Sequence, residues 1–273
     1  MLIDLIKFIF LGFIQGITEP IPVSSSGHLL IFQKILSGNN LDIDFGLLAT
    51  LTNFGSLIAI ILIFRKDIID LIKSFFGYLT TKKEDYKDNY KYCWLVVIGT
   101  IPAGIMGIIV TKLGIFDALE ENTKFVGVTL LITALFLFLI RKLKGKKNPN
   151  QITYKDALVV GLFQVVALIP GISRSGATIV GGMTRKFKRE TAFNFSFILY
   201  IPISVATTIL GISDLISSNL SINMWICYIS ATIVAGLFTY IGTLWFRNIV
   251  KNGKLIYFVI YCLIVGSLVI LFL

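Results

Sequence analysis

The stretch that decides the fold is residues 12–28, which read GFIQGITEPIPVSSSGH. It holds the only histidine of the chain, a glutamate, three consecutive serines and two prolines, and apolar runs lie on both sides of it. Ionisable side chains are costly at membrane depth, so they are kept there mainly where they serve a function. The stretch therefore predicts a polar site inside a membrane-embedded region.

The composition indicates an all-α polytopic membrane protein. The hydrophobic fraction of the 273 residues is 56% and the mean hydropathy is +0.86, whereas soluble proteins are about 45–50% apolar. The net charge of +10 would suit nucleic-acid binding, but basic cytoplasmic loops explain it as well, so we expect no nucleic-acid partner. Cys93, Cys227 and Cys262 stand singly, which predicts neither a disulfide nor a zinc site. The N-terminal run carries Asp4 and Lys7, so we expect no cleaved signal peptide there.

Apolar runs predict six crossings of the bilayer and two pairs of shorter arms. A full crossing needs about 20 apolar residues. Each short arm falls below that length and therefore predicts half of a hairpin. The short arms are expected at 2–17 and 27–36, and again at 157–169 and 176–183; the crossings are expected at 45–64, 92–110, 123–140, 191–212, 224–246 and 255–273.

The distribution of basic residues predicts the orientation of the loops. The loops rich in Lys and Arg should be cytoplasmic, and those poor in these residues should be external. Residues 156–184 then begin and end beside cytoplasmic loops, so they must enter the membrane and return. The same logic makes residues 1–36 a hairpin that enters from outside if the N-terminus is external. The cytoplasmic loops are 65–91, 141–155, 185–189 and 247–254, and the external loops are 37–44, 112–124 and 212–223.

An internal repeat appears when the first stretch is shifted by 149 residues. Each half then contains one hairpin and three crossings, so the second copy is inverted relative to the first. Inverted repeats with broken helices commonly build a site near the midplane, so we expect the two tips to face each other across one cavity. A chance match between two apolar segments rich in Ser and Gly is the alternative. The domain is a single one, 1–273, divided into repeat one over 1–140, a basic linker over 141–155 and repeat two over 156–273; the paired residues are Gly12 and Gly161, Gln15 and Gln164, Ser24 and Ser173, Ser26 and Ser175, and Gly27 and Gly176.

Arg174 lies in the second copy, within residues 170–178, which read PGISRSGAT. A short loop that opens a helix presents unpaired backbone N–H groups, and the helix dipole adds positive potential. A guanidinium and serine hydroxyls at that place suit the binding of phosphate oxygens. The alternative is that Arg174 pairs with Glu19 for structure alone.

The first copy carries the groups suited to catalysis. Glu19 and Gln15 are four residues apart and share a helix face, so their oxygens could hold a Mg²⁺ or Ca²⁺ ion, although Glu19 could serve only as a counter-ion. Ser25 is a candidate nucleophile, with His28, three residues further on, as its proton acceptor. The neighbouring serines could instead cap the helix through their hydroxyls.

Three motifs carry a resemblance to a known family. Residues 15–19, QGITE, look like an (E/Q)xxxE motif, residues 22–28, PVSSSGH, look like the segment after it, and residues 170–178 resemble a PGxSRSGxT motif. The whole chain is similar to the undecaprenyl-pyrophosphate phosphatase family, also called the bacitracin-resistance protein family. The resemblance implies a bacterial cell-membrane enzyme, helped by Mg²⁺ or Ca²⁺, with its site open to the external face. It implies hydrolysis of undecaprenyl pyrophosphate to undecaprenyl phosphate, the lipid carrier recycled for peptidoglycan synthesis.

The resemblance also assigns roles by position. Glu19 and Gln15 would handle the metal and the pyrophosphate, and Glu19 would supply the charge alone, because many members have Glu where this chain has Gln15. Ser25 and His28 would be the nucleophile and its acid–base partner, with competing versions in the family as to which attacks. The positions expected to bind the phosphate groups are Ser24, Ser26, Gly27, Gly171, Ser173, Arg174, Ser175, Gly176 and Thr178.

The rival interpretation is a transporter or flippase of a phosphorylated lipid or anion, because inverted repeats with broken helices are typical of transporters. The pair Ser25 and His28 favours the enzyme, since a transporter needs binding groups but no nucleophile. A purely structural scaffold would leave the embedded Glu19, His28 and Arg174 unexplained. The sequence leaves the oligomeric state open, a homo-oligomer included.

Overall fold

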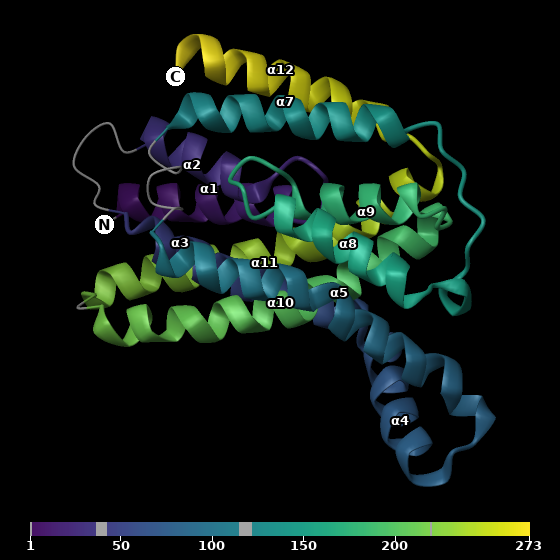
Figure 1. Cartoon of the computed structure of the whole chain (residues 1–273). Helices are drawn as coiled ribbons and strands as arrows, with labels where there is room; N and C mark the ends of the chain where they lie inside the picture. Colours follow the sequence, from purple (N-terminus) through teal and green to yellow (C-terminus); the bar gives the residue numbers. More distant parts are fainter. Residues whose placement is uncertain (1, 37–42, 115–121, 219) are drawn as a thin grey trace.

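Helices form the framework of this structure, a computed structural model that describes residues 2–36, 43–114, 122–218 and 220–273. The long helices run side by side, and both chain termini lie at the same end of the bundle (Figure 1). The helices are α1 (Leu2–Thr18), α2 (Ser25–Leu36), α3 (Phe45–Ile63), α4 (Arg65–Thr81), α5 (Lys87–Lys112), α7 (Thr123–Ile140), α8 (Tyr154–Val166), α9 (Arg174–Thr184), α10 (Arg189–Ser217), α11 (Ile222–Lys251) and α12 (Ile256–Phe272), with short 3-10 turns at Glu84–Tyr86 and Pro149–Gln151.

Five helices in the described part of the chain are long and apolar enough to cross a membrane, namely α3, α5 with the turn before it, α7, α10 and α11. The all-α polytopic class is therefore confirmed. The sixth predicted crossing corresponds to α12, which is also apolar but has only 17 residues. The predicted external loops at 37–44 and 112–124 lie largely outside the described residues.

One predicted loop is wrong, because residues 65–91 contain the helix α4 and the first turn of α5. Figure 1 shows α4 projecting from the bundle beside the start of α5. The apolar side of α4 packs on α5: the rings of Phe75 and Tyr90 lie 5.3 Å apart, and the thiol of Cys93 donates to the Leu71 carbonyl oxygen at 3.7 Å. Counting charges predicted a cytoplasmic loop here but overlooked the helical spacing of its apolar residues.

The short helices form two hairpins, α1 with α2 and α8 with α9, as the sequence predicts. A serine begins the second helix of each. The Ser24 hydroxyl accepts from the N–H of Gly27 at 3.3 Å, and the Ser173 hydroxyl accepts from the N–H of Gly176 at 3.1 Å. This is the bonding of a helix N-cap. Because the shift of 149 residues pairs these two serines, the matched sequences adopt the same local structure.

The tips of the two hairpins meet between the longer helices. A Cβ atom on Gly27 would lie 3.0 Å from the Cα of Gly171, and the Ser175 hydroxyl donates to the Ile21 carbonyl oxygen at 3.4 Å. Each tip also contacts a helix outside its own hairpin. On α7 the Thr133 hydroxyl donates to the Gly171 carbonyl oxygen at 3.2 Å. Protein thus covers the irregular backbone, which is the condition for such backbone at membrane depth.

The helix contacts of one half are repeated in the other. Helix α1 packs against α11, and α8 packs against α5. A Cβ atom on Gly12 would collide with the Ala231 carbonyl oxygen, and one on Gly161 would lie 2.5 Å from that of Gly99. A two-fold relation between the halves predicts this pattern, in which the first helix of each hairpin packs against a helix of the other half. The inverted orientation in the membrane and the repeat boundaries 1–140, 141–155 and 156–273 stay predictions.

Basic loops meet at one end of the bundle. The linker runs beside the loop after α9: the N–H of Lys147 donates to the Lys186 carbonyl oxygen at 2.9 Å, and the N–H of Lys188 donates to the Lys147 carbonyl oxygen at 3.0 Å. The Asn150 amide donates to the Asp88 carboxylate at 2.7 Å and so joins the first turn of α5, within the basic segment 65–91, to the linker. These contacts agree with one cytoplasmic side for all three loops.

Asp156 ties the start of α8 to this end, outside the membrane-spanning helices. Its side chain is fully buried and pairs with Lys147 at 2.6 Å and with Arg185 at 2.7 Å. Burial alone would raise the pKa of the Asp156 carboxyl group. Hydrogen bonds from Lys147, the Thr153 backbone and Arg185 outweigh that effect and lower the pKa to about 2. The carboxylate therefore holds two basic segments against the second hairpin.

Replacing Gly12 by Val should loosen the contact between α1 and α11. The added side chain would collide with the backbone of Ala231, and overpacking of this kind costs about 1–3 kcal/mol. Gly104→Val is the matched control, because no atom lies within 4 Å of a Cβ built there. Thermal unfolding in detergent should show a lower midpoint for Gly12→Val alone. Equal midpoints for both variants would contradict the close packing of these helices.

Asp156→Asn should remove a pH-dependent share of the stability. Because the folded pKa lies below the ordinary 3.8, the contribution of the charge is present above pH 3.8 and is lost as the pH falls through about 2. The wild type should exceed Asp156→Asn by about 2 kcal/mol in unfolding free energy at pH 6, and most of this difference should be lost at pH 2. The exposed Asp85→Asn is the control. A difference between wild type and Asp156→Asn that does not change with pH would refute the assignment.

Candidate active site

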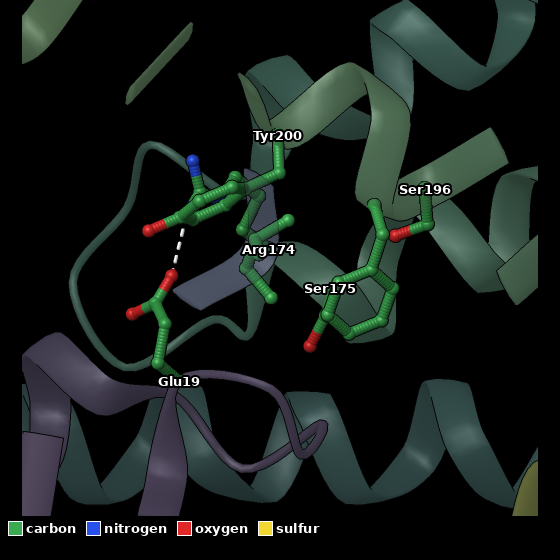
Figure 2. Close-up of a pocket in the computed structure, with 7 residues that line it drawn as sticks. Glu19, Arg174, Ser175, Ser196 and Tyr200 are labelled. Atoms are coloured by element: carbon green, nitrogen blue, oxygen red, sulfur yellow. Dashed lines mark hydrogen bonds and ion pairs between the residues drawn. The ribbon is translucent and has the colours of Figure 1, made fainter. Parts of the chain in front are cut away.

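The centre of the site is an ion pair between the two hairpin tips. An oxygen of Glu19, at the end of α1, accepts a hydrogen bond from the guanidinium of Arg174, the first residue of α9. Figure 2 shows the two side chains directed toward each other. Only 9% of the Glu19 side chain and 23% of the Arg174 side chain is exposed. The structure therefore joins the two residues that the sequence singled out in separate halves.

The second oxygen of Glu19 is engaged by the first tip. The Ser25 hydroxyl and the side-chain amide of Gln15, the latter at 2.9 Å, both donate to it. The contact with Gln15 follows from the spacing of four residues on α1. The contact with Ser25 depends on the turn after α1, which brings the start of α2 back over the end of α1. Glu19 thus links the candidate nucleophile to the arginine.

Arg174 is held by α10 as well, and α10 is in turn bonded to α3. Its guanidinium carbon lies 4.0 Å from the centre of the Tyr200 ring, and one of its nitrogens donates to the Ser204 hydroxyl at 3.3 Å. The Tyr200 hydroxyl donates to the side-chain oxygen of Asn53 at 2.9 Å. Sequence reasoning missed these three residues. Their signal was present, since each is a polar group within an otherwise apolar crossing.

A cavity of about 300 Å³ opens beside the ion pair. Eight of the predicted site residues line it, and its remaining walls are mainly apolar. A second space of about 10 Å³, large enough for one water molecule, lies behind the pair against Tyr200 and Ser196 (Figure 2). The lining residues that the sequence predicts are Gln15, Glu19, Ser24, Ser25, Ser26, Ser173, Arg174 and Ser175.

Four predicted phosphate-binding residues do not line this cavity. Gly27 and Gly171 pack against each other where the tips cross, and Gly171 has a φ of +88°, a conformation that favours glycine. The N–H of Gly176 is used to cap α9. The Thr178 hydroxyl bonds to the Arg174 carbonyl oxygen at 2.9 Å within its own helix. These residues shape the tips, and a direct contact of theirs with phosphate stays a prediction.

His28 is also placed differently from the prediction. It is buried but does not line the cavity. Its Nδ1 lies 2.7 Å from the Ser24 carbonyl oxygen and its Nε2 lies 2.8 Å from the hydroxyl oxygen of Tyr261. Since both ring nitrogens are engaged there and Ser25 turns to Glu19, the expected contact between Ser25 and His28 is not formed.

The residues present fit a metal ion only if phosphate oxygens and water molecules supply most of its ligands. No group of three or more His, Cys, Asp or Glu side chains suited to a metal occurs within the described ranges. Glu19 offers one carboxylate, and Gln15 offers an amide oxygen, because its NH₂ group is the one that faces Glu19. Mg²⁺ is often held by one or two protein oxygens together with phosphate oxygens and waters. This donor set suits such a cation.

The arrangement can bind and cleave a small anionic group. Arg174 and the start of α9 supply positive potential on one wall. Ser25 supplies a hydroxyl on the facing wall, with a carboxylate placed to accept its proton. The apolar remainder of the cavity suits an attached hydrocarbon rather than a sugar or peptide.

Comparison with known proteins agrees with this chemistry. A family model described as bacitracin resistance protein BacA matches residues 8–268. Undecaprenyl-diphosphatase 2 of Bacillus thuringiensis is 45% identical over 269 residues, which cover 98% of each chain. Undecaprenyl-diphosphatase 1 of Bacillus licheniformis is 45% identical over 98% of each chain, and the undecaprenyl-diphosphatase of Oceanobacillus iheyensis is 41% identical over 98% of this chain and 97% of its own. The chain therefore belongs to the family of the bacitracin resistance protein BacA.

Proposed function

We propose that this protein is an undecaprenyl-diphosphatase, which hydrolyses undecaprenyl diphosphate to undecaprenyl phosphate and inorganic phosphate. The observation that carries the proposal is the Ser25, Glu19 and Arg174 constellation, which brings a nucleophile, a proton acceptor and a phosphate-binding cation to one cavity. The family and its curated relatives support the same activity. The reaction is hydrolysis of a phosphoric anhydride.

Substrate binding begins with an exchange of partners at Arg174. The diphosphate takes over the guanidinium from Glu19, and the N-terminus of α9 adds its backbone N–H groups. Stabilising the charge on the transferred phosphoryl group is the main requirement of such reactions. Tyr200 and Ser204 keep the guanidinium in place during this exchange. The polyprenyl chain leaves the cavity along its apolar walls, between the helices.

The chemical step uses the first tip. Once released from Arg174, the Glu19 carboxylate accepts the proton of the Ser25 hydroxyl, whose oxygen attacks the terminal phosphorus. The bond from that phosphorus to the bridging oxygen breaks, and undecaprenyl phosphate leaves. Water then attacks the phosphoserine, phosphate departs, and the proton returns from Glu19 to Ser25. Glu19 takes the acceptor role that the sequence had suggested for His28.

A divalent cation, Mg²⁺ or Ca²⁺, is part of the proposal. Glu19 and Gln15 would hold it together with oxygens of the diphosphate. When bound, it neutralises part of the charge of the diphosphate. Chelation should therefore reduce the affinity for the substrate more than it reduces the stability of the folded protein.

We further propose that the protein resides in the bacterial cell membrane with this cavity open to the external face. The basic loops lie together at the end of the bundle away from both termini. The positive-inside rule makes that end the cytoplasmic one. A phosphatase so placed would return the lipid carrier to peptidoglycan synthesis and give bacitracin resistance.

Ser25→Ala should abolish phosphate release from undecaprenyl diphosphate by the purified protein in detergent. Loss of a serine nucleophile costs more than about 1,000-fold in kcat. Ser218→Ala, at the distant end of α10, is the matched control and should retain activity. Detergent solution admits no gradient, so release by the wild type separates an enzyme from a transporter. Substantial turnover by Ser25→Ala would remove Ser25 from the nucleophile role.

The Tyr200 ring should matter more than its hydroxyl. Tyr200→Leu removes the aromatic face from Arg174, an interaction worth about 1–2 kcal/mol when shielded from water, and should raise KM about tenfold. Tyr200→Phe keeps the ring and loses only the hydrogen bonds of the hydroxyl, among them those to the side chain and the carbonyl oxygen of Asn53, so KM should rise about threefold or less. Phosphate release at varied substrate concentration gives both values. Equal KM values for the two variants would contradict the stacking role.

A further inference from the structure

His28 and Tyr261 form a buried contact that the proposed reaction does not use. The His28 side chain is almost fully buried, whereas Tyr261 is 39% exposed on the outer side of α12. Their rings lie nearly parallel, with an angle of 16° and centres 5.5 Å apart, and the Tyr261 hydroxyl lies 2.8 Å from Nε2. These two residues are 233 positions apart in the sequence.

The bonding partners determine which nitrogen of His28 carries the proton. A carbonyl oxygen can only accept a hydrogen bond, so Nδ1 must donate to Ser24 and carries the hydrogen. In the neutral imidazole the remaining lone pair is on Nε2, where it accepts the hydrogen bond from Tyr261. No lone pair of His28 is then left for the Ser25 hydroxyl, which donates to Glu19.

The carbonyl group that His28 binds belongs to an unusual residue. Ser24 has a φ of +69°, in the left-handed region that non-glycine residues rarely adopt. Such a conformation persists only where the surroundings impose it. The Ser24 carbonyl oxygen accepts from both the N–H and the Nδ1–H of His28, and the Ser24 hydroxyl accepts from Gly27. Ser25, the nucleophile, is the next residue.

Helix α12 contacts this turn at a second point. The thiol of Cys262, the residue after Tyr261, lies 3.9 Å from the Pro22 carbonyl oxygen. Helix α7, which packs against α12, braces the other tip in the same way through Thr133 and Gly171. Each tip is therefore held by the last helix of the opposite half, and the contact of His28 with Tyr261 is part of that arrangement.

We propose that His28 and Tyr261 are positioning residues that hold the left-handed turn at Ser24 and thereby aim the Ser25 hydroxyl at the cavity. His28 then acts through its Nδ1–H and exchanges no proton with the substrate. Tyr261 orients the imidazole from α12. This role rests on the proposed phosphatase activity, which requires that the wild type release phosphate from undecaprenyl diphosphate.

The variants that test this role separate the hydrogen-bond donor of His28 from the acid–base function of its imidazole ring. His28→Asn places an amide NH₂ where Nδ1–H stood, so it keeps the bond to Ser24 but has no acid–base function. His28→Ala removes both. Tyr261→Phe removes only the hydroxyl, and Tyr257→Phe, on the exposed side of α12 one turn earlier, is its control.

Phosphate release by the full-length protein in detergent, from pH 5.5 to 9, gives kcat and KM for each variant. We expect His28→Ala to lose about tenfold or more in kcat, and His28→Asn to stay within about threefold of wild type with a pH profile of the same shape. Tyr261→Phe should lose about threefold or more in kcat with KM unchanged, and Tyr257→Phe should match wild type.

Two results would overturn the positioning role. One is a folded His28→Asn that is as inactive as His28→Ala, or that loses a limb of the wild-type pH profile, since either identifies the ring as an acid or base. The other is a Tyr261→Phe that equals Tyr257→Phe, which would decide the matter even if His28→Asn failed to fold. Absence of phosphate release by the wild type would refute the proposed function itself and is read separately.

Discussion

The ion pair between Glu19 and Arg174 is the constraint on which the rest of the structure depends. It joins two tips that are 155 residues apart in the sequence and lie among apolar helices. Removing one partner of this partly buried pair leaves the other charge unpaired, which destabilises the folded protein. The pair therefore holds the two hairpins together while the cavity is empty. In the proposed reaction a diphosphate replaces Glu19 as the partner of the arginine, which turns a structural contact into a binding site.

The surrounding helices make this exchange feasible because each partner is held independently of the pair. Gln15 and Ser25 keep the carboxylate in place from its own tip, whereas Tyr200 and Ser204 keep the guanidinium in place from α10. Neither group then needs to reorganise when the pair opens, and preorganised charges of this kind supply much of the stabilisation of phosphoryl transfer. Close glycine contacts of α1 with α11 and of α8 with α5 fix the hairpins that carry both groups.

The sequence was sufficient for the framework and for the principal charged groups. Apolar runs, basic loops and the repeat predicted the helices, the two hairpins and the meeting of Glu19 with Arg174. Contacts that depend on three-dimensional packing were beyond it. Spacing placed His28 one turn after Ser25, but the left-handed turn at Ser24 directs the imidazole toward Tyr261 on the last helix. The high charge of residues 65–91 led likewise to the prediction of a loop where α4 lies. No local sequence pattern connects Asn53 with Tyr200.

The most direct test of the account is a double-mutant cycle across the tips. The free energy of unfolding in detergent would be measured for wild type, Glu19→Gln, Arg174→Gln and the double variant. Contacting charged residues couple by about 0.5–3 kcal/mol. We predict a coupling energy of at least about 1 kcal/mol, so that the double variant is less destabilised than the sum of the single variants. Strict additivity of the two substitutions would contradict the claim that the halves are joined at this pair.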